Sequence, residues 1–492
     1  MSGLTAYRGS WNKTLAAHLL NRAGFGGTPE EIDRVTQMPM DEAVESFLDF
    51  TKSTDDVPPP KMPDNPDSIR ELRNLTTEQK QALFRANREA IEEIRGWWVT
   101  RMLRSPRPLQ EKLTLFWHGH FATSANDVKN ARHMLQQNQF LRQHCAGNFR
   151  DLVLGISRDP AMLKYLDNNT NRKGRPNENY ARELLELFTI GIGHYTEEDV
   201  KEAARAFTGW TFVGDEFRFV SFQHDYGSKT FLGRSGNFDG ADIVDIILEQ
   251  PRTTEFIAAK LFAFFVHENP APMLVTQLGN ALRGEKYELR PFLRMLFRSE
   301  IFYSPAAWRT QIKSPAQLVV GTARLLGVET NPRALVVAMR TLGQDLLFPP
   351  NVKGWDGGEA WINTNTLLSR YNVAGFITKG SQEAAKVAAN DDEPMMEMEM
   401  DRKQARKAGA MERVQRAWAG PDFERIAPRA LREDPEKLVD SLVFRFFQAP
   451  LGAKERATFA EYARSKKGAV FTNKEAGELC HLMLSTPHYQ LA

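Results

Sequence analysis

Apolar side chains recur every three to four residues through most of the chain, which is the period of an amphipathic α-helix. The stretch NENYARELLELFTI (177–190) shows this pattern, with an apolar stripe made of Tyr180, Ala181, Leu184, Leu185, Leu187 and Phe188. Apolar and polar residues alternate around a Gly-Asp turn in WTFVGDEFRFVSF (210–222), which predicts a β-hairpin. The pattern therefore predicts a mainly α fold, a large multi-helix domain with one small β-hairpin and long loops.

Helix ends are marked in at least two places. In TPEEIDRV, Thr28 is predicted to be an N-cap, and Glu31 three residues later completes a capping box. In GIGHYTEEDV, Thr196 is predicted to be the N-cap of another helix, with acidic residues in its first turn.

Composition divides the chain into three parts. Residues 1–383 hold the helical pattern and are predicted to form the main helical domain. Residues 384–412 are rich in charge and methionine without an apolar stripe, and we expect a flexible linker or an insertion. Residues 413–492 are helical again and are predicted to pack on the main domain. A toroid-like arrangement of helices would fit the length of 492 residues.

The overall charge is close to neutral. The 64 Lys and Arg residues nearly balance the 62 Asp and Glu residues, so a nucleic-acid-binding protein is not expected. No stretch approaches the ~18 consecutive apolar residues of a membrane span. The N-terminal stretch lacks the apolar run of a signal peptide, so we expect a cytoplasmic protein, or a periplasmic or exported one if a leader has been removed.

The two cysteines, Cys145 and Cys480, are too few for a disulfide scaffold and suit a reducing compartment. The sequence leaves open whether they pair. The chain contains no Walker loop, no dinucleotide GxGxxG after a strand, no HExxH and no GxSxG. We therefore expect no nucleotide or dinucleotide cofactor, which leaves acid–base chemistry, metal-assisted chemistry or no chemistry.

The polar face of the stretch 177–190 has two interpretations. Glu178, Arg182 and Glu186 are four residues apart and form a line on the helix surface. An exposed ladder of this kind contributes only about 0.3–0.5 kcal/mol per pair. On this interpretation the line is a solvated face.

The second interpretation starts from the two amides at the beginning of the stretch, Asn177 and Asn179. Free backbone N–H groups at a helix N-terminus, together with amides, can bind a polar or anionic ligand. Glu178 and Glu183 would then line a cleft. The sequence leaves both interpretations open.

Three histidines stand out. His118 and His120 lie in WHGHF, and a helix would point them in different directions, so a metal shared by the two is not expected. We interpret His120 as a core residue and His118 as the candidate for a site. His194 follows on a glycine-rich turn, where it can face solvent or a cleft.

The stretch HDYGSK (224–229) follows the predicted hairpin. The adjacent His224 and Asp225 can act in acid–base catalysis or bind a metal, and Lys229 can hold a negative group. The alternative is an Asx-type turn in which Asp225 caps backbone groups.

A long loop is predicted for FPPNVKGWDGGEAWINTNT (348–366), which lacks a regular period. Trp355, Trp361, Asn363 and Asn365 have the composition of a platform that stacks on sugar rings. Tryptophans that anchor the loop to the core would explain the same composition equally well.

Six stretches follow one another in an order typical of a known family: AAHLLNRAGFGGTPEEI, LFWHGHFAT, NENYARELLELFTIGIGHYTEEDVKEAARAFTGW, HDYGSKTFLG, KSPAQLVVG and LGQDLLFPPNVKGWDGGEAWINT. With them the chain resembles a bacterial family catalogued as domain of unknown function 1800, over about residues 15–375. The resemblance implies a mainly helical fold and names no reaction. Many members of that family occur alongside a second family that resembles sulfatases, which implies a sulfatase-like partner, and some members look exported.

The first hypothesis is an enzyme, a hydrolase or a lyase, that acts on a polar or anionic carbohydrate such as an oligosaccharide or polysaccharide. Glu178 or Glu183 would be the general acid or base, with His224 and Asp225 as the partner pair. The residues predicted to bind the substrate are Asn177, Asn179, Arg182, His118, His194, Lys229, Trp355, Trp361, Asn363 and Asn365.

Two other hypotheses remain. The protein can be a non-catalytic binding or maturation partner of a sulfatase-like protein, which docks through the polar cleft or through residues 384–410. It can also be a metal-binding protein in which His118, His224 and Asp225 hold a divalent metal together with Glu178.

Overall fold

The computed structural model describes residues 4–51, 57–66, 69–328, 331–379, 420–449, 451–466 and 471–492. The segment 384–412, for which we predicted a linker or insertion, lies outside the described residues, and so does the docking surface predicted for 384–410. The boundaries predicted at residues 383 and 412 stay a prediction. The described chain is mainly α-helical, as expected.

The first part of the chain forms helices only. Its elements are α1 (Lys13–Ala23), α2 (Pro29–Thr36), α3 (Met40–Leu48), α4 (Ile69–Asn74), α5 (Thr77–Arg104), α6 (Pro108–His120), α7 (Ala125–Val128), α8 (Ala131–His144), α9 (Phe149–Arg158), α10 (Pro160–Tyr165), η1 (Asn168–Thr170), α11 (Asn179–Glu183), η2 (Leu184–Thr189) and α12 (Glu197–Ala206). The capping box predicted at Thr28 and Glu31 is confirmed at the start of α2, and Thr196 caps α12 as predicted.

Two small antiparallel hairpins follow, β1 (Trp210–Val213) with β2 (Glu216–Phe219), and β3 (Lys229–Phe231) with β4 (Arg234–Gly236); the short helix η3 (Ser221–Gln223) lies between them. The first hairpin is the predicted one. The structure also contains the second hairpin, whose turn lacks the usual Asn-Gly or Asp-Gly signal and was therefore not predicted. This turn uses Leu232 at φ 44° and Gly233 at φ 79°, and Asp199 accepts a hydrogen bond from the Leu232 amide at 2.7 Å.

Helices resume in the rest of the chain. The elements are α13 (Gly240–Glu249), α14 (Pro251–Phe265), α15 (Pro272–Gly284), α16 (Leu289–Phe297), α17 (Pro315–Leu325), α18 (Pro332–Thr341), η4 (Gly358–Trp361), α19 (Thr364–Lys379), α22 (Phe423–Ile426), α23 (Arg429–Arg432), α24 (Pro435–Phe447), α25 (Ala453–Ser465), α26 (Asn473–Leu484) and η6 (Pro487–Gln490). Many of these helices begin with proline, whose missing N–H costs nothing at a first helical position.

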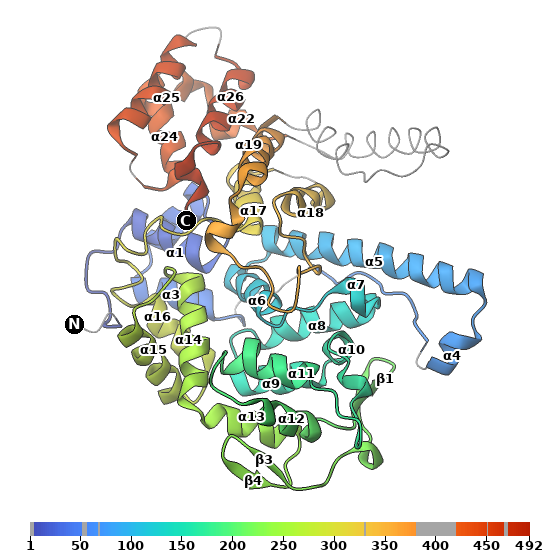
Figure 1. Cartoon of the computed structure of the whole chain (residues 1–492). Helices are drawn as coiled ribbons and strands as arrows, with labels where there is room; N and C mark the ends of the chain where they lie inside the picture. Colours follow the sequence, from blue (N-terminus) through green and yellow to red (C-terminus); the bar gives the residue numbers. More distant parts are fainter. Residues whose placement is uncertain are drawn as a thin grey trace.

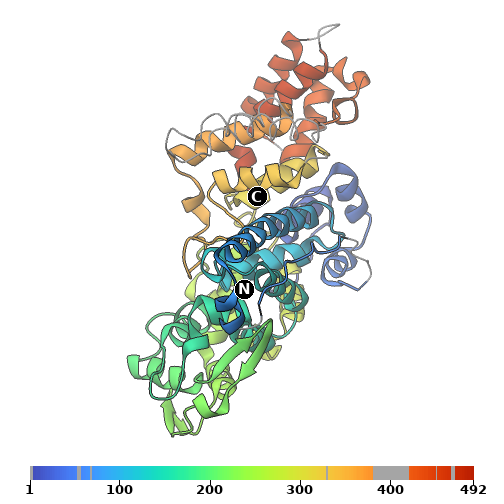
Figure 2. The same ribbon diagram turned by 90° about the vertical axis from the view of Figure 1, so that its right-hand side faces the viewer.

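The described elements form an elongated body (Figure 1). The C-terminal helices α24 to α26 lie at one end and the β3–β4 hairpin lies at the other, and the view turned by 90° shows the same extension (Figure 2). The helices therefore do not close into the toroid-like arrangement that we considered from the chain length. No helix among the described residues combines the length and the apolar character needed to cross a bilayer.

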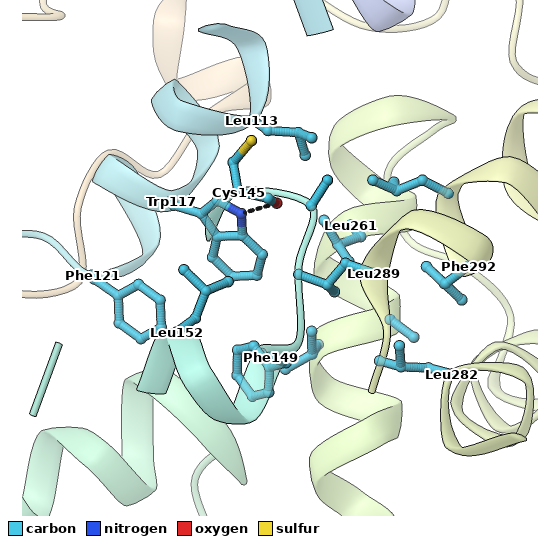
Figure 3. Close-up of a cluster of buried hydrophobic side chains, with 14 of the residues drawn as sticks. Leu113, Trp117, Phe121, Cys145, Phe149, Leu152, Leu261, Leu282, Leu289 and Phe292 are labelled. Atoms are coloured by element: carbon cyan, nitrogen blue, oxygen red, sulfur yellow. Dashed lines mark hydrogen bonds between the residues drawn. The ribbon is translucent and has the colours of Figure 1, made fainter. Parts of the chain in front are cut away.

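Two hydrophobic clusters hold the body together. The first joins α1, α6, α9, α14 and α16, and at its centre Trp117 donates a hydrogen bond to the Cys145 carbonyl at 2.8 Å (Figure 3). The second joins α5, α17, α18 and α19 to the C-terminal helices α24 to α26. Cys145 and Cys480 are both buried and free, each in a different cluster, so they do not pair.

The C-terminal helices are also tied to the main body by polar contacts. The side chain of Gln448 accepts a hydrogen bond from Asn21 at 2.6 Å, and Arg445 donates to the Leu325 carbonyl at 3.0 Å. The last residues form backbone hydrogen bonds to the segment before α17, including Lys313 to the carbonyl of Gln490 at 2.8 Å.

A buried ion network connects α5, α6 and α8. The fully buried carboxylate of Glu111 accepts hydrogen bonds from Arg101 at 2.9 Å, from Arg142 at 2.8 and 3.0 Å, and from the Trp98 indole at 3.1 Å. Both guanidinium groups lie over the ring of Trp97, 5.2 and 4.8 Å from its centroid. The network fixes the position of α6, on which one wall of the cleft described below is built.

Candidate functional site

A cleft of about 450 Å³ opens between α6, α14, the segment before α17 and the long loop that precedes α19. Its size falls within the range of small-molecule sites. The residues of its lining that matter for chemistry are Lys112, His120, Lys260, Glu268, Trp355 and Trp361.

Helical spacing explains how α6 and α14 build the walls. On α6, Lys112, Phe116 and His120 are four residues apart and lie on one face. On α14, Lys260 and Phe264 have the same spacing. The rings of Phe116 and Phe264 pack against each other at 5.0 Å between their centroids, which joins the two faces.

Lys112 has an unusual environment for an amine. Only 4% of the residue is exposed, its Nζ lies 5.2 and 5.6 Å from the ring centroids of Phe25 and Phe264, and no group of the described residues accepts a hydrogen bond from it. Burial, followed by the charges of Arg22 and Lys313, lowers the pKa of Lys112 from 10.5 to about 7. A buried amine without an acceptor is costly unless something in the cleft pairs with it.

Two further buried cations near Lys112, those of Arg22 and Lys313, also lack a carboxylate partner among the described residues. The buried guanidinium of Arg22 donates to the Val266 carbonyl at 2.7 Å and to the side chain of Gln311. The buried amine of Lys313 lies 3.8 Å from the ring centroid of Tyr489. Burial and neighbouring cations lower the pKa of Lys313 to about 7, and burial lowers that of Arg22 to about 9. This side of the cleft is therefore electropositive.

Lys260 of α14 lies beside His120, at the end of the α6 wall away from Lys112. Its Nζ lies 3.2 Å from Nδ1 of His120, and it donates to the carbonyl of Leu187 at 3.1 Å. Burial, followed by the charge of Lys353, lowers the pKa of Lys260 from 10.5 to about 8. An amine with a pKa this close to neutrality can exchange a proton with a ligand.

The stretch 184–189 positions this pair from behind. It forms a π-helix, η2, whose final carbonyls lack ordinary helical donors. The carbonyl of Leu187 accepts from Lys260, and that of Phe188 accepts from Nε2 of His120 at 3.0 Å. The predicted helix thus orients Lys260 and His120 through its backbone carbonyls.

The long loop before α19 that carries Trp355 and Trp361, called the tryptophan loop below, closes the cleft by packing directly on α6. Gly354 has φ 83°, and a Cβ at this position would collide with the carbonyl oxygen of Gly119. Two glycines therefore allow the two backbones to touch, which brings Trp355 and Trp361 into the lining of the cleft. Asn363 accepts hydrogen bonds from the amides of Asn365 and Thr366, both at 3.0 Å, and so caps the start of α19.

The polar face of α11 lies at the surface. Arg182 forms hydrogen bonds of 2.8 Å to both carboxylate oxygens of Glu197 and one of 3.2 Å to Glu178. Asn177 accepts from the amide of Asn179 at 3.0 Å. Partial burial, followed by the charge of Glu186, raises the pKa of the Glu183 carboxyl.

None of these α11 residues lines the cleft described above. His194 is exposed on the turn that follows the π-helix.

The HDYGSK stretch forms a self-contained turn beside α12. Asp225 accepts from the Gly227 amide at 2.8 Å, which confirms the Asx-type turn, and it pairs with Arg205 at 2.8 Å. His224 is buried and its Nδ1 lies 2.9 Å from the Thr208 carbonyl. Lys229 donates to the carbonyls of Asp225 at 2.6 Å and Gly227 at 3.1 Å.

Replacing Asp225 distinguishes its structural role in the turn from the catalytic role that we predicted. Arg205 holds the pKa of the Asp225 carboxyl down at about 2, from 3.8. Asp225→Asn should therefore lower the free energy of unfolding at pH 7 by about 1–2 kcal/mol. Because the carboxyl pKa is depressed by folding, this contribution is fully present above pH 3.8 and is lost as the pH falls toward 2.

Urea unfolding of the wild type and Asp225→Asn at pH 7 and at pH 3.5 measures this difference. We expect a smaller gap between the two proteins at the lower pH. An unchanged stability at both values would contradict the structural role and return Asp225 to the catalytic candidates.

His118 lies in the interior of the protein. Only 1% of it is exposed, its Nε2 accepts the amide hydrogen of Leu347 at 3.2 Å, and its ring contacts Trp98 and Trp355. Among the described residues, no three His, Cys, Asp or Glu side chains come together as a metal site would require. His118, His224 and Asp225 therefore do not meet at one point.

Sequence reasoning missed Lys112 and Lys260, and it assigned His120 to the core. One signal was available in the sequence. Each lysine interrupts an apolar stretch, Lys112 in LQEKLTLF and Lys260 in TEFIAAKLFAFF, and each lies four residues before a phenylalanine. A lysine in such a position is either paired or faces a cavity, and only the packing of α6 against α14 shows which.

The described residues thus define a mainly α protein with an electropositive, tryptophan-lined cleft. Residues 18–491 match the family described as "Protein of unknown function (DUF1800)", so the chain belongs to that family. No curated protein and no solved structure matches the chain.

Proposed function

We propose that the protein binds an anionic carbohydrate in this cleft and acts on it by acid–base chemistry. The main support is that the unpaired amine of Lys112 faces the same cleft as Trp355 and Trp361. A carbohydrate with carboxylate or sulfate groups offers an acceptor to the amine and apolar ring faces to the indoles.

The acid–base part of the proposal rests on the titratable groups that line the cleft. Lys260 has a pKa of about 8 and is oriented by His120, and Glu268 also lines the cleft. The earlier assignment of catalysis to Glu178, Glu183, His224 and Asp225 stays a prediction. We prefer the cleft residues Lys260, His120 and Glu268 as the catalytic groups, because the cleft offers a space in which a ligand can bind.

Isothermal titration with oligomers of galacturonic acid, sulfated oligosaccharides and neutral oligosaccharides of equal length tests the binding. We expect the wild type to bind at least one anionic oligomer and to bind the neutral oligomers more weakly. Trp355→Ala should weaken binding roughly two- to tenfold, because an aromatic stacking contact is worth about 0.5–1.5 kcal/mol.

Phe222→Ala is the matched control, because this aromatic side chain is 83% exposed and lies outside the cleft. It should bind as the wild type does. Equal affinity for neutral and anionic oligomers would refute the role of Lys112. Binding of none of them would refute the proposal as a whole.

A further inference from the structure

The hydrogen bonds around Lys260 specify the tautomer of His120. The Phe188 carbonyl can only accept, so Nε2 of His120, 3.0 Å away, carries the ring proton. Nδ1 of His120 is then an acceptor, and Lys260 donates to it at 3.2 Å and to the Leu187 carbonyl at 3.1 Å.

A neutral amine fits this arrangement fully. It has two N–H groups, which the His120 nitrogen and the Leu187 carbonyl accept, and one lone pair, which is left for the third tetrahedral direction. Lys260 lines the cleft, where a bound ligand can meet this lone pair. The burial that lowers the pKa of Lys260 to about 8 makes the neutral form accessible near pH 7.

The carboxylates of the cleft do not fit glycoside hydrolysis. That reaction uses two carboxyl groups on opposite sides of the bond that is cleaved. Two carboxylates line this cleft, and one of them, Asp356, is paired with Lys353 at 2.5 Å. Among the described residues of the lining, Glu268 is then the single unpaired carboxylate.

The cleft instead combines a basic amine with separate cations. Lys353 lies close enough to Lys260 to affect its pKa, and its own side chain is 66% exposed. Asp356 accepts one of its three N–H groups, which leaves two for a ligand. Lys112 is eight residues before His120 on α6, about 12 Å along the helix axis. Lys112 therefore contacts a more distant part of a ligand than Lys260 does.

We propose that the cleft cleaves uronic-acid-containing polysaccharides by β-elimination, with Lys260 as the base, Lys353 as the cation at the uronate carboxylate, and Lys112 as the anchor for a second uronate along the chain. This inference rests on the proposed function and specifies its substrate and reaction. His120 acts through Lys260 and is a positioning residue.

The reaction balances without water or an oxidant. Lys260 takes the proton from C5 of the uronate, and the negative charge spreads into the carboxylate beside Lys353. A double bond then forms between C4 and C5 while the bond from C4 to the leaving oxygen breaks. The proton held by Lys260 passes to that oxygen, so the amine returns to its neutral state.

The experiment incubates the full chain with oligomers of galacturonic, mannuronic and guluronic acid. Two products are followed, the ultraviolet absorbance of the conjugated C4–C5 double bond and the number of new reducing ends. We expect both to rise together with the wild type on at least one oligomer. Lys260→Met should lower the rate roughly 10²–10⁴-fold, the usual contribution of a general base.

Two further variants and one control make the test specific. Lys260→Arg keeps the cation but cannot lose its proton near pH 7, so it should be folded, bind the oligomer and remain inactive. His120→Gln should shift the rising limb of the pH–rate profile, which a purely structural residue would not do. Lys201→Met removes an exposed lysine outside the cleft and should leave the rate unchanged.

The outcomes distinguish the two proposals. New reducing ends without the absorbance mean hydrolysis, which overturns the elimination and keeps the proposed function. Full activity in Lys260→Met or Lys260→Arg overturns Lys260 as the base. Binding with no product overturns the elimination and the acid–base part of the proposed function, whereas no binding to any oligomer overturns both proposals.

Discussion

Replacing Glu111 by glutamine is expected to lower the free energy of unfolding by about 3–5 kcal/mol. The carboxylate is the counter-charge of two buried guanidinium groups, those of Arg101 and Arg142. Glutamine keeps the shape of the side chain but removes its charge. The two cations would then face each other in the protein interior, where their repulsion is weakly screened.

Urea unfolding followed by tryptophan fluorescence measures this loss, since Trp97 and Trp98 lie within the network. The control is Glu198→Gln, whose carboxylate is 69% exposed and pairs with Lys201 at 3.5 Å. It should cost less than about 0.5 kcal/mol. Similar losses in the two variants would contradict the argument that burial makes the Glu111 network important.

Lys112→Met is expected to have the opposite effect on stability. At pH 6 it should raise the free energy of unfolding by about 1–3 kcal/mol, because methionine removes a buried amine without an acceptor and keeps its bulk. Folding depresses the pKa of Lys112 from 10.5 to about 7. The unfolded chain therefore binds the proton more tightly, and the amine opposes folding most strongly below pH 7.

The gain in stability should shrink as the pH rises from 7 and end above 10.5, where the amine is neutral in both states. Denaturant unfolding at pH 6, 8 and 10 tests this order. The exposed Lys201→Met serves as the control and should show no such trend. A destabilised Lys112→Met at pH 6 would mean that the amine has a structural partner.

The same variant should lose affinity for anionic oligosaccharides. A hydrogen bond to a charged group contributes about 1.5–3 kcal/mol, so binding should weaken by roughly 10- to 100-fold. In the wild type the affinity should fall as the pH rises through about 7, because an anion binds the protonated form of Lys112. Titration calorimetry at pH 6 and 8 measures both effects, and a pH-independent affinity would contradict them.

The helical class could be predicted because its signals are local. The apolar period of residues 177–190, the capping box at Thr28 and the Gly-Asp turn near 214 involve residues within a few positions of one another. Such signals act before any tertiary contact forms. Where the local signal is unusual, prediction failed, as at Leu232, whose positive φ is supported by a hydrogen bond to Asp199 from another element.

The site depends on contacts between distant parts of the chain. More than a hundred residues separate Lys112 from Lys260, and nearly a hundred separate Lys260 from Trp355. No local pattern links the three. The contact of Gly354 with Gly119 brings the tryptophan loop onto α6, and the packing of Phe116 against Phe264 brings the two lysines onto one cleft.

The sequence by itself determined the mainly helical class, the first hairpin, several helix ends and the motifs that mark the family. Only the tertiary structure decided which polar residues face a common space. It placed the polar side chains of α11 at the surface, formed a turn from HDYGSK, and left Lys112 buried without an acceptor. The physical reason is that burial and pairing of a charged side chain depend on neighbours from other elements, which the spacing of residues along one element does not specify.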